Sequence, residues 1–361
     1  MTTSGGQWPV GPDGVPVGPW APPGWASGPP APKPGTVPLR PLHPSDIISG
    51  VFATAGRYRK PLYLPLLVLA LACSLLVGGC AWAALSELGR LPAEGGQLTD
   101  GEFTRAAWVV GIVFGLVLVC ATVAYAATAA LSTTVLGHAV LGRSVTAREA
   151  WAQARPQLGR VLGTQLLTAA AALGILAVSA LPSILLGVTL NSPAPALYGL
   201  FLLVPGLVGA LYVGVRLVIA VPVAVMERQR PAAAIRRAWQ LNHGAWWRSL
   251  GVTYAVRAVG SAVSQTITSV VAAVALRLVL SDALTTEQLD VSTLSGADLA
   301  LLIVAVGGAV VLTTTLSAPL TPLAVGLLYL DRRMTRENLA AGLAAAAGLP
   351  PDSSTGQMGR S

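Results

Sequence analysis

Six long runs of apolar residues follow one another along the chain, and short polar stretches separate them. The runs lie near residues 61–85, 106–140, 161–190, 196–226, 249–280 and 299–330. A helix rises about 1.5 Å per residue, so roughly 20 apolar residues cross the ~30 Å hydrocarbon core of a bilayer. Every run reaches that length. The pattern therefore predicts an all-α, polytopic membrane bundle of six transmembrane helices.

Two of the polar stretches have related sequences. "AREAWAQARPQLGRVLG" (147–163) and "IRRAWQLNHGAWWRSLG" (235–251) agree at six positions when they are aligned at an offset of 88 residues. At 100° per residue, Ala150 and Trp151 lie on one side of the first stretch, as Ala238 and Trp239 do in the second. We therefore expect a repeated unit of span, short amphipathic helix and span, over roughly 106–190 and 196–280.

The ends of the two short helices are also marked in the sequence. Thr146 and Glu149 have the spacing of a capping box, and Pro231 suits the first turn of the second helix. Pro156 and Gly244 occupy the same aligned position, and each disfavours a continued helix. Each short helix is therefore predicted to end there, before a new span begins.

A third unit is predicted to be split between the two ends of the chain. "PSDIISGVFATAGRYRK" precedes the first span, and "LLYLDRRMTREN" closes the last. Pro222-Val223-Ala224-Val225 and Pro322-Leu323-Ala324-Val325 lie 100 residues apart, at corresponding ends of two spans. A helix over the first segment would carry an apolar side, which consists of Ile47, Ile48, Val51, Phe52 and Ala55.

Two interpretations of the short helices remain open. Tryptophan on one side and arginine on the other suit the membrane interface, where indoles lie at headgroup depth and guanidinium groups meet phosphates. The tryptophans could instead pack against the ends of neighbouring spans and fix the angle between them. The candidate interfacial anchors are Trp151, Trp239, Trp246 and Trp247.

The distribution of arginine predicts the orientation. With 53% hydrophobic and 11% charged residues, and a mean hydropathy of +0.67, the composition is that of a membrane protein. Segments 1–60, 141–160, 227–248 and 331–361 hold 5, 4, 5 and 4 basic residues, against 3 in the loops on the other side. Cytoplasmic loops accumulate Lys and Arg, so both termini are predicted to be cytoplasmic, in a protein of the inner cell membrane.

Three regions are predicted along the chain. Residues 1–41 are rich in proline and glycine and form a disordered cytoplasmic tail, residues 42–337 form the six-span domain, and residues 338–361 form a second short cytoplasmic tail. The first region has no apolar core and no cleavage-like site, so no secretory signal is expected. The net charge of +8 is spread over one membrane face, which favours anionic lipids as partners and not nucleic acid.

Arg216 and Arg257 are the charged residues inside the apolar runs, if Arg277 marks an outer end. On upright helices they would lie at similar depths, and no Asp or Glu in a span could neutralise them, so a phosphate-bearing lipid or metabolite between spans four and five is one interpretation. The other interpretation favours the interface, because 19 uncharged residues precede Arg216 and 19 separate Arg257 from Arg277. That length suffices to span a membrane.

The sequence gives little support for catalysis. Cys73, Cys80 and Cys120 lie inside spans, and neither they nor the three histidines have the spacing of a metal site or disulfide framework. Motifs of zinc proteases, serine hydrolases and phosphate-binding loops do not occur. No enzyme activity, metal or cofactor is therefore expected.

The chain resembles a bacterial family, the six-span membrane domain of glycerophosphoryl diester phosphodiesterases, in particular its stand-alone actinobacterial-type members. The resemblance covers about residues 32–345 and rests on "PKPGTVPLRPLHPSDIISGVF", "RLVIAVPVAVMERQRPAAAIRRAWQLNHGAWWRSLG" and "LLYLDRRMTREN". In two-domain relatives a separate soluble domain carries the diesterase activity. Here "AGLAAAAGLPPDSSTGQMGRS" follows instead, so the resemblance implies the fold without that activity.

Two functions are predicted. The first is a non-catalytic accessory or scaffold module of the cell envelope, with unknown protein partners. The alternative is a transporter or lipid-handling permease that binds an anionic lipid or metabolite near Arg216 and Arg257. The candidate ligands of an anion or a headgroup are Arg216, Arg257, Arg236, Arg237 and Arg248.

Overall fold

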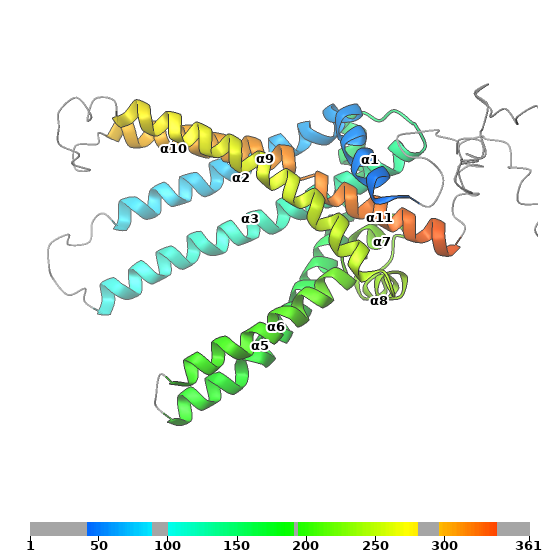
Figure 1. Ribbon diagram of the computed structural model, residues 1–361. Helices are drawn as coiled ribbons and strands as arrows, with labels where there is room; N and C mark the ends of the chain where they lie inside the picture. The colour runs from blue at the N-terminus through cyan, green and yellow to red at the C-terminus, as the bar shows by residue number, and fades with distance from the viewer. Residues whose placement is uncertain (1–41, 89–99, 191–193, 281–295, 338–361) are drawn as a thin grey trace, which may run out of the picture.

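The structure is a computed structural model that describes residues 42–88, 100–190, 194–280 and 296–337, and in these ranges every regular element is a helix (Figure 1). Within them, six segments are long and apolar enough to cross a membrane. The all-α fold is confirmed, and the chain is a multi-pass membrane protein. The predicted tails, 1–41 and 338–361, lie outside the described residues, as do most of the acidic loops.

The six spans are formed by single helices or by pairs of helices in line. Four are single helices: α2 (Arg59–Leu88), α3 (Asp100–Val140), α5 (Leu158–Leu190) and α9 (Trp246–Leu280). The fourth span is α6 (Ala194–Arg216) followed by α7 (Ala220–Met226), and the sixth is α10 (Gly296–Ser317) followed by α11 (Leu320–Glu337).

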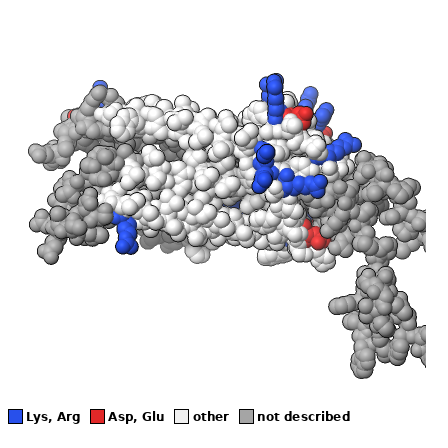
Figure 2. Space-filling model, turned by 90° about the horizontal axis from the view of Figure 1, so that it is seen from above, with Lys and Arg blue, Asp and Glu red and all other residues white. Residues whose placement is uncertain are grey.

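The short helices gather at one end of the bundle, together with α7 and α11 (Figure 1). They are α1 (Pro44–Arg57), α4 (Ala147–Ala154), the single 3-10 turn η1 (Arg155–Gln157) and α8 (Pro231–Leu241). Blue Lys and Arg side chains cluster at this end, and an uncharged surface extends from it along the molecule (Figure 2). We call the part formed by these helices the basic end. Exposed apolar side chains cover the spans beyond it, Leu75, Phe114 and Leu185 among them, as a lipid-facing surface requires.

Helix α11 is the centre of the hydrophobic core, which lies at the basic end. Every residue from Pro322 to Arg332 is buried, and α11 packs against α1, α3 and α9. A Cβ added at Gly326 would lie 2.4 Å from Cδ2 of Leu136 on α3. A larger residue at this position would therefore force the buried side chain of Leu136 to move.

Two spans are interrupted where they enter this core, which the continuous runs predicted at 196–226 and 299–330 did not anticipate. Helix α6 ends at Arg216 and α7 begins at Ala220, and α10 ends at Ser317 before α11 begins at Leu320. Prolines lack the N–H that would continue the hydrogen-bond ladder, and Pro222 and Pro322 are each the third residue after the interruption. The 100-residue sequence correspondence thus coincides with two similar breaks.

The short helices begin and end where the sequence predicts. Thr146 Oγ1 accepts a hydrogen bond from the Glu149 N–H at 3.3 Å, and Glu149 Oε2 accepts one from the Thr146 N–H at 3.0 Å. Pro231 is the first residue of α8. Helix α4 ends before Pro156, and α8 ends before Gly244, whose φ of +77° is one that L side chains rarely adopt. The predicted caps and stops are confirmed.

Helix α1 buries most of its predicted apolar side. Ile47, Val51 and Ala55 are buried in the core, and Ile48 packs partly against it. Phe52 lies 100° from Val51 around the helix, at the edge of the apolar side, and is 44% exposed.

Helices α5 and α6 form a close pair that diverges from the other spans away from the basic end (Figure 1). Pro182 and Pro205 lie inside these helices without ending them. A Cβ added at Gly206 would lie 1.9 Å from Oγ of Ser179, whereas one added at Gly174 or Gly214 would meet nothing within 4 Å. Gly206 therefore lies at a close contact between α5 and α6.

Candidate functional site

Two adjacent cavities lie between the helices and are partly open to the outside, and they share three lining residues, Tyr125, Arg257 and Thr321, of which Tyr125 and Arg257 are exposed. The inner cavity, about 320 Å³, lies next to both helix breaks and is lined from α3, α6, α7, α9 and α11. The outer cavity, about 510 Å³, is lined from α2, α3, α9, α10 and α11, with Ala318 from the second break. Both volumes fall in the range of small-molecule sites, about 300–1,000 Å³.

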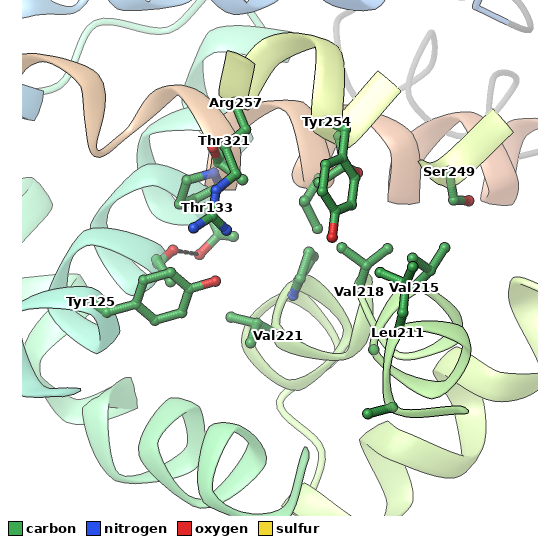
Figure 3. Close-up of a pocket in the computed structure, with 17 residues that line it drawn as sticks. Tyr125, Thr133, Leu211, Val215, Val218, Val221, Ser249, Tyr254, Arg257 and Thr321 are labelled. Carbon is green, nitrogen blue, oxygen red and sulfur yellow. Dashed lines mark hydrogen bonds between the residues drawn. The ribbon is translucent and has the colours of Figure 1, made fainter. Parts of the chain in front are cut away.

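Arg257 stands between the cavities. It lies on α9, eleven residues after Trp246, or roughly 16 Å along the helix. In Figure 3 its guanidinium group extends toward the same space as the hydroxyl groups of Tyr125 and Tyr254. The residues that line the two cavities include no Asp or Glu, and within the described ranges Arg257 makes no ion pair. No carboxylate of the described residues therefore neutralises its charge.

Further polar atoms face the inner cavity. Thr253, one turn before Arg257, also lines it, and its buried Oγ1 has no hydrogen-bond partner among the described residues. Because a buried hydroxyl without a partner is costly, such a group usually contacts water or a ligand. Ser249 lines the same cavity but is already bonded, since its Oγ donates to Oδ1 of Asn242 at 2.6 Å.

A polar stripe runs from Arg257 along α9 in the outer cavity. Ser261, Ser264 and Gln265 line this cavity and follow Arg257 at helical spacing. Ser264 Oγ donates to the Thr313 carbonyl on α10 at 3.2 Å, and one turn later the hydroxyls of Thr268 and Thr313 are 3.2 Å apart. The hydroxyls therefore join α9 to α10 and line the cavity wall with polar groups.

Arg216 lies elsewhere. It is the last residue of α6, and it is 7% exposed. Its guanidinium carbon is 4.4 Å from the ring centroid of Trp239 and 5.8 Å from that of Tyr212. It does not line either of the two cavities that contain Arg257. Arg216 packs against Trp239 of α8, and the structure does not bring the two arginines into one cavity.

Asn242 closes the break after α6. Its Nδ2 donates to the carbonyl oxygens of Val215 at 2.8 Å and Arg216 at 3.3 Å, and its side chain is fully buried. The last carbonyls of a helix have no partner within that helix. One side chain at the end of α8 therefore caps α6 and, through Ser249, also contacts α9.

Arg248 is occupied by contacts within the core. It pairs with Asp331 at 3.2 Å and donates to the carbonyl of Leu42, while Asp331 Oδ1 accepts the Leu42 N–H at 2.9 Å. Asp331 is fully buried. These bonds hold the first described residue of the chain between α9 and α11.

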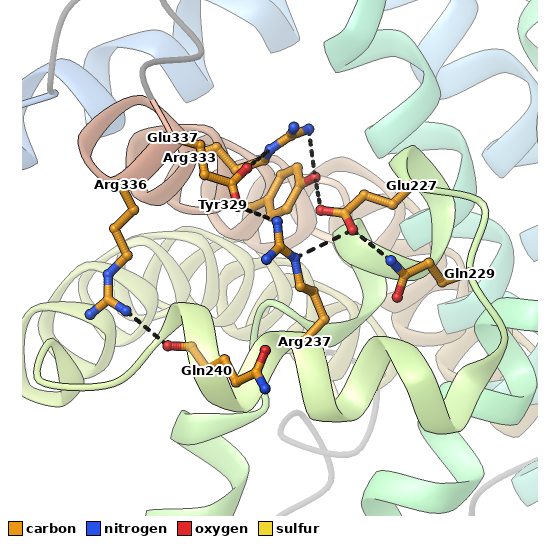
Figure 4. Close-up of polar contacts among 8 residues, drawn as sticks. All are labelled: Glu227, Gln229, Arg237, Gln240, Tyr329, Arg333, Arg336 and Glu337. Atoms are coloured by element: carbon orange, nitrogen blue, oxygen red, sulfur yellow. Dashed lines mark hydrogen bonds and ion pairs between the residues drawn. The ribbon is translucent and has the colours of Figure 1, made fainter.

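Arg237 belongs to a second network, which joins α8 to α11 (Figure 4). It pairs with Glu227 at 3.5 Å and with Glu337, and Glu227 also accepts a hydrogen bond from the hydroxyl of the buried Tyr329 at 2.8 Å. Arg333 pairs with Glu337 at 2.8 Å. These carboxylates neutralise Arg237, so it acts in the protein's own packing.

The remaining sequence candidates lie on the surface of the basic end. Arg236 is exposed and Trp151 is half-buried. Trp239 covers Arg216 and remains 39% exposed. Trp246 donates from Nε1 to the Tyr212 carbonyl at 3.3 Å and contacts Trp247, which is 78% exposed. Trp239 and Trp246 each pack against a span, as expected if the tryptophans fix the angle between spans. Each also keeps part of its ring exposed, as a position at the membrane interface would require.

Sequence reasoning missed several polar residues of the site. Tyr125, Tyr254 and Thr321 lie in apolar runs, where a single hydroxyl is common and gives no signal. The serines and Gln265 of α9 do share one helical side, so a search for polar periodicity within the spans would have found them.

Comparison with protein-family models, curated proteins and solved structures gave no match for this chain. The resemblance to the phosphodiesterase membrane domain therefore stays a prediction. Within the described ranges, no group of three or more His, Cys, Asp or Glu side chains lies together in a way that could hold a metal ion.

Proposed function

We propose that this integral membrane protein is a lipid-handling permease, whose ligand is an anionic amphiphile held at Arg257. The observation that carries the proposal is an unpaired guanidinium group between two cavities without a carboxylate in their walls. Two opposite charges 4 Å apart attract by about 4 kcal/mol at an effective dielectric constant of 20. A phosphate group is thus the natural counterion for this residue, and guanidinium binds it with paired hydrogen bonds.

The start of α11 supports an anionic ligand. Thr321, the second residue of this 18-residue helix, lines both cavities. The first N–H groups of a helix have no partner within it, and the helix dipole favours negative charge there. Arg257 and the beginning of α11 therefore both favour negative charge in the cavities that they line.

The polar stripe and its surroundings favour an amphiphile over a soluble anion. Hydroxyl groups follow Arg257 along α9, while leucines of α2 line the opposite wall of the outer cavity. The outward faces of the same spans are exposed and apolar. Such walls suit a lipid whose polar headgroup enters the cavity and whose acyl chains remain in the bilayer.

A scaffold role is the second candidate, and the exposed aromatic and basic surface formed by α8 and the start of α9 favours it. Trp247 at 78% exposure and Arg236 are free to contact headgroups or another protein. In this role the two cavities would hold structural lipid, and no transport would occur.

We further propose that the basic end is cytoplasmic, with α4 and α8 at the interface as copies of one repeated unit. The excess of arginine supports the orientation. The common burial of the aligned Ala150 and Ala238, both 0% exposed, supports the repeat. We also propose a non-catalytic protein, because the cavities offer hydroxyl groups and one arginine but no paired acid and base.

The binding step is tested by mass spectrometry of lipid that copurifies with the full-length protein. Arg257→Gln should lower the retained anionic phospholipid at least roughly tenfold, because charge-assisted bonds to phosphate are lost. Arg257→Lys should retain part of it. Arg277→Gln is the matched control, since Arg277 is exposed on the same helix outside both cavities. Equal lipid in Arg257→Gln and Arg277→Gln would refute binding at this residue.

The transport step needs a separate assay. The protein is reconstituted into vesicles that contain a fluorescent phosphatidylglycerol, and an impermeant quencher reports how fast the lipid exchanges between leaflets. A permease accelerates exchange, and Arg257→Gln slows it to the rate of protein-free vesicles. Retained lipid without accelerated exchange favours the scaffold role.

A further inference from the structure

A groove of about 700 Å³ lies outside the bundle core, where α1, α2 and α10 meet. Most of its lining is apolar and comes from three elements: Phe52 of α1, Leu64 and Leu67 of α2, and Leu312 and Leu316 of α10. Phe52, Leu64 and Leu316 are 44%, 59% and 45% exposed. The groove is therefore accessible from the side that faces lipid.

Two adjacent cations, Arg59 and Lys60, stand at one end of the groove. Both are exposed at the start of α2, and within the described ranges neither makes an ion pair. The lining contains no Asp or Glu, and its other polar side chains are Tyr63 and Thr315. The charge of the groove is thus positive at the basic end, and its walls are apolar beyond.

We propose that this groove binds one anionic phospholipid from the leaflet at the basic end. The phosphate would lie at Arg59 and Lys60, and an acyl chain would follow Leu64 and Leu67 toward the bilayer centre. Arg59 and Leu67 are eight residues apart, or roughly 12 Å along α2, which leaves the headgroup at the interface and the chain in hydrocarbon. Tyr63, one turn from the cations, has the apolar body and polar tip that suit this boundary.

The shape and charge favour a lipid over a protein segment. A helix docked along the groove would need apolar contacts at both ends, whereas this groove has cations at one end only. A membrane that contains phosphatidylglycerol or a similar lipid supplies a molecule with one anionic headgroup and apolar chains at high local concentration.

This site is distinct from the cavities at Arg257. The groove is lined by Tyr63, Leu64 and Leu67, whereas the outer cavity is lined by Leu66, Leu69 and Ala70. The two share Thr315 of α10 but use different sides of α2. The proposal therefore does not depend on the proposed function, and either can fail alone.

The test measures lipid binding to the delipidated full-length protein in detergent by native mass spectrometry. Dioleoyl phosphatidylglycerol, dioleoyl phosphatidylcholine and inorganic phosphate are titrated separately. The experiment is run in the Arg257→Gln background, so that binding at that residue does not contribute. We expect one phosphatidylglycerol to bind, phosphatidylcholine to bind at least roughly tenfold more weakly, and inorganic phosphate not to compete.

Two variants remove the site by different means. Arg59→Gln with Lys60→Gln should weaken phosphatidylglycerol at least roughly tenfold, because each basic residue near an anionic headgroup contributes several-fold in affinity. Gly56→Trp should block the apolar part, since Gly56 lines the groove and an added Cβ there meets nothing within 4 Å. Arg57→Gln with Arg277→Gln removes the same charge from exposed positions outside the groove, and this control should bind as before.

The outcomes separate the possible occupants. Unchanged phosphatidylglycerol affinity in the Arg59→Gln, Lys60→Gln variant overturns the proposal, whatever happens to Gly56→Trp. Equal affinity for phosphatidylcholine overturns the assignment of an anionic lipid, and competition by inorganic phosphate would indicate a free anion site. A stable dimer that dissociates in the charge variant would assign the groove to a second copy of the chain.

Discussion

The surroundings of Arg216 and Arg257 differ in how they accommodate a guanidinium group. Arg216 is packed on Trp239 at the basic end, among helices joined by buried hydrogen bonds and ion pairs. Arg257 lines two cavities and has no carboxylate near it in their walls. Within the described residues neither arginine makes an ion pair, but Arg216 is buried against aromatic rings that belong to the fold, whereas Arg257 is exposed in a cavity and is available to a ligand.

The largest effect is expected from removing the carboxylate at the centre of the packed region. Asp331→Ala should destabilise the protein by about 3–5 kcal/mol, because it leaves Arg248 and Arg332 without their buried partner. Thermal unfolding in detergent measures the loss. Asp331→Asn keeps an acceptor for the Leu42 N–H and should lose less. A melting temperature within about 2 °C of the unchanged protein would show that the packed region does not depend on this charge.

The cap on α6 should have the next largest effect. Asn242→Ala removes the donor to the Val215 and Arg216 carbonyls and leaves both buried, at a cost of about 1–3 kcal/mol. The same unfolding assay measures it. Ser249→Ala, which removes only the bond to Asn242 Oδ1, is the smaller control, with about 0.5–1.5 kcal/mol. If the two variants unfold alike, Asn242 does not act as the cap.

A double-mutant cycle tests the contact of Arg216 with Trp239. Arg216→Gln and Trp239→Leu should each destabilise the protein, and the cycle should give a coupling of about 0.5–2 kcal/mol from the cation–π contact. Additive losses would mean that the two side chains stabilise the fold independently. That result would remove the main difference between this arginine and Arg257.

The smallest effect on stability is expected at Arg257. Without added lipid, Arg257→Gln should unfold within about 0.5 kcal/mol of the unchanged protein, because no internal partner is lost. Added phosphatidylglycerol should then raise the melting temperature of the unchanged protein more than that of the variant, since a ligand stabilises the state it binds. A large loss of stability without lipid would mean that Arg257 serves the fold.

The six spans and the ends of the short helices could be predicted because they depend on local rules: run length, capping and the effects of proline and glycine. The exact positions of the breaks after Arg216 and Ser317 could not, because apolar residues continue through both. The nearby prolines at 222, 319 and 322 disfavour a continued helix but do not fix the residue at which it ends. The partners of Arg237 and Arg248 are Glu227, Glu337 and Asp331. Asp331 and Glu337 are about 80 to 100 residues from their partners in sequence, a separation at which local periodicity carries no information.

The two helix breaks also have a mechanical consequence. Both lie at the boundary between the packed core and the lipid-facing part of the spans, and both adjoin the inner cavity, at Val215, Val218 and Thr321. The regular hydrogen-bond ladder is interrupted there, and turn bonds such as that from the Ala220 N–H to the Leu217 carbonyl replace it. A change in helix direction at these positions would alter the width of the inner cavity beside Arg257, while the bonds of Asn242 keep the end of α6 fixed to the base.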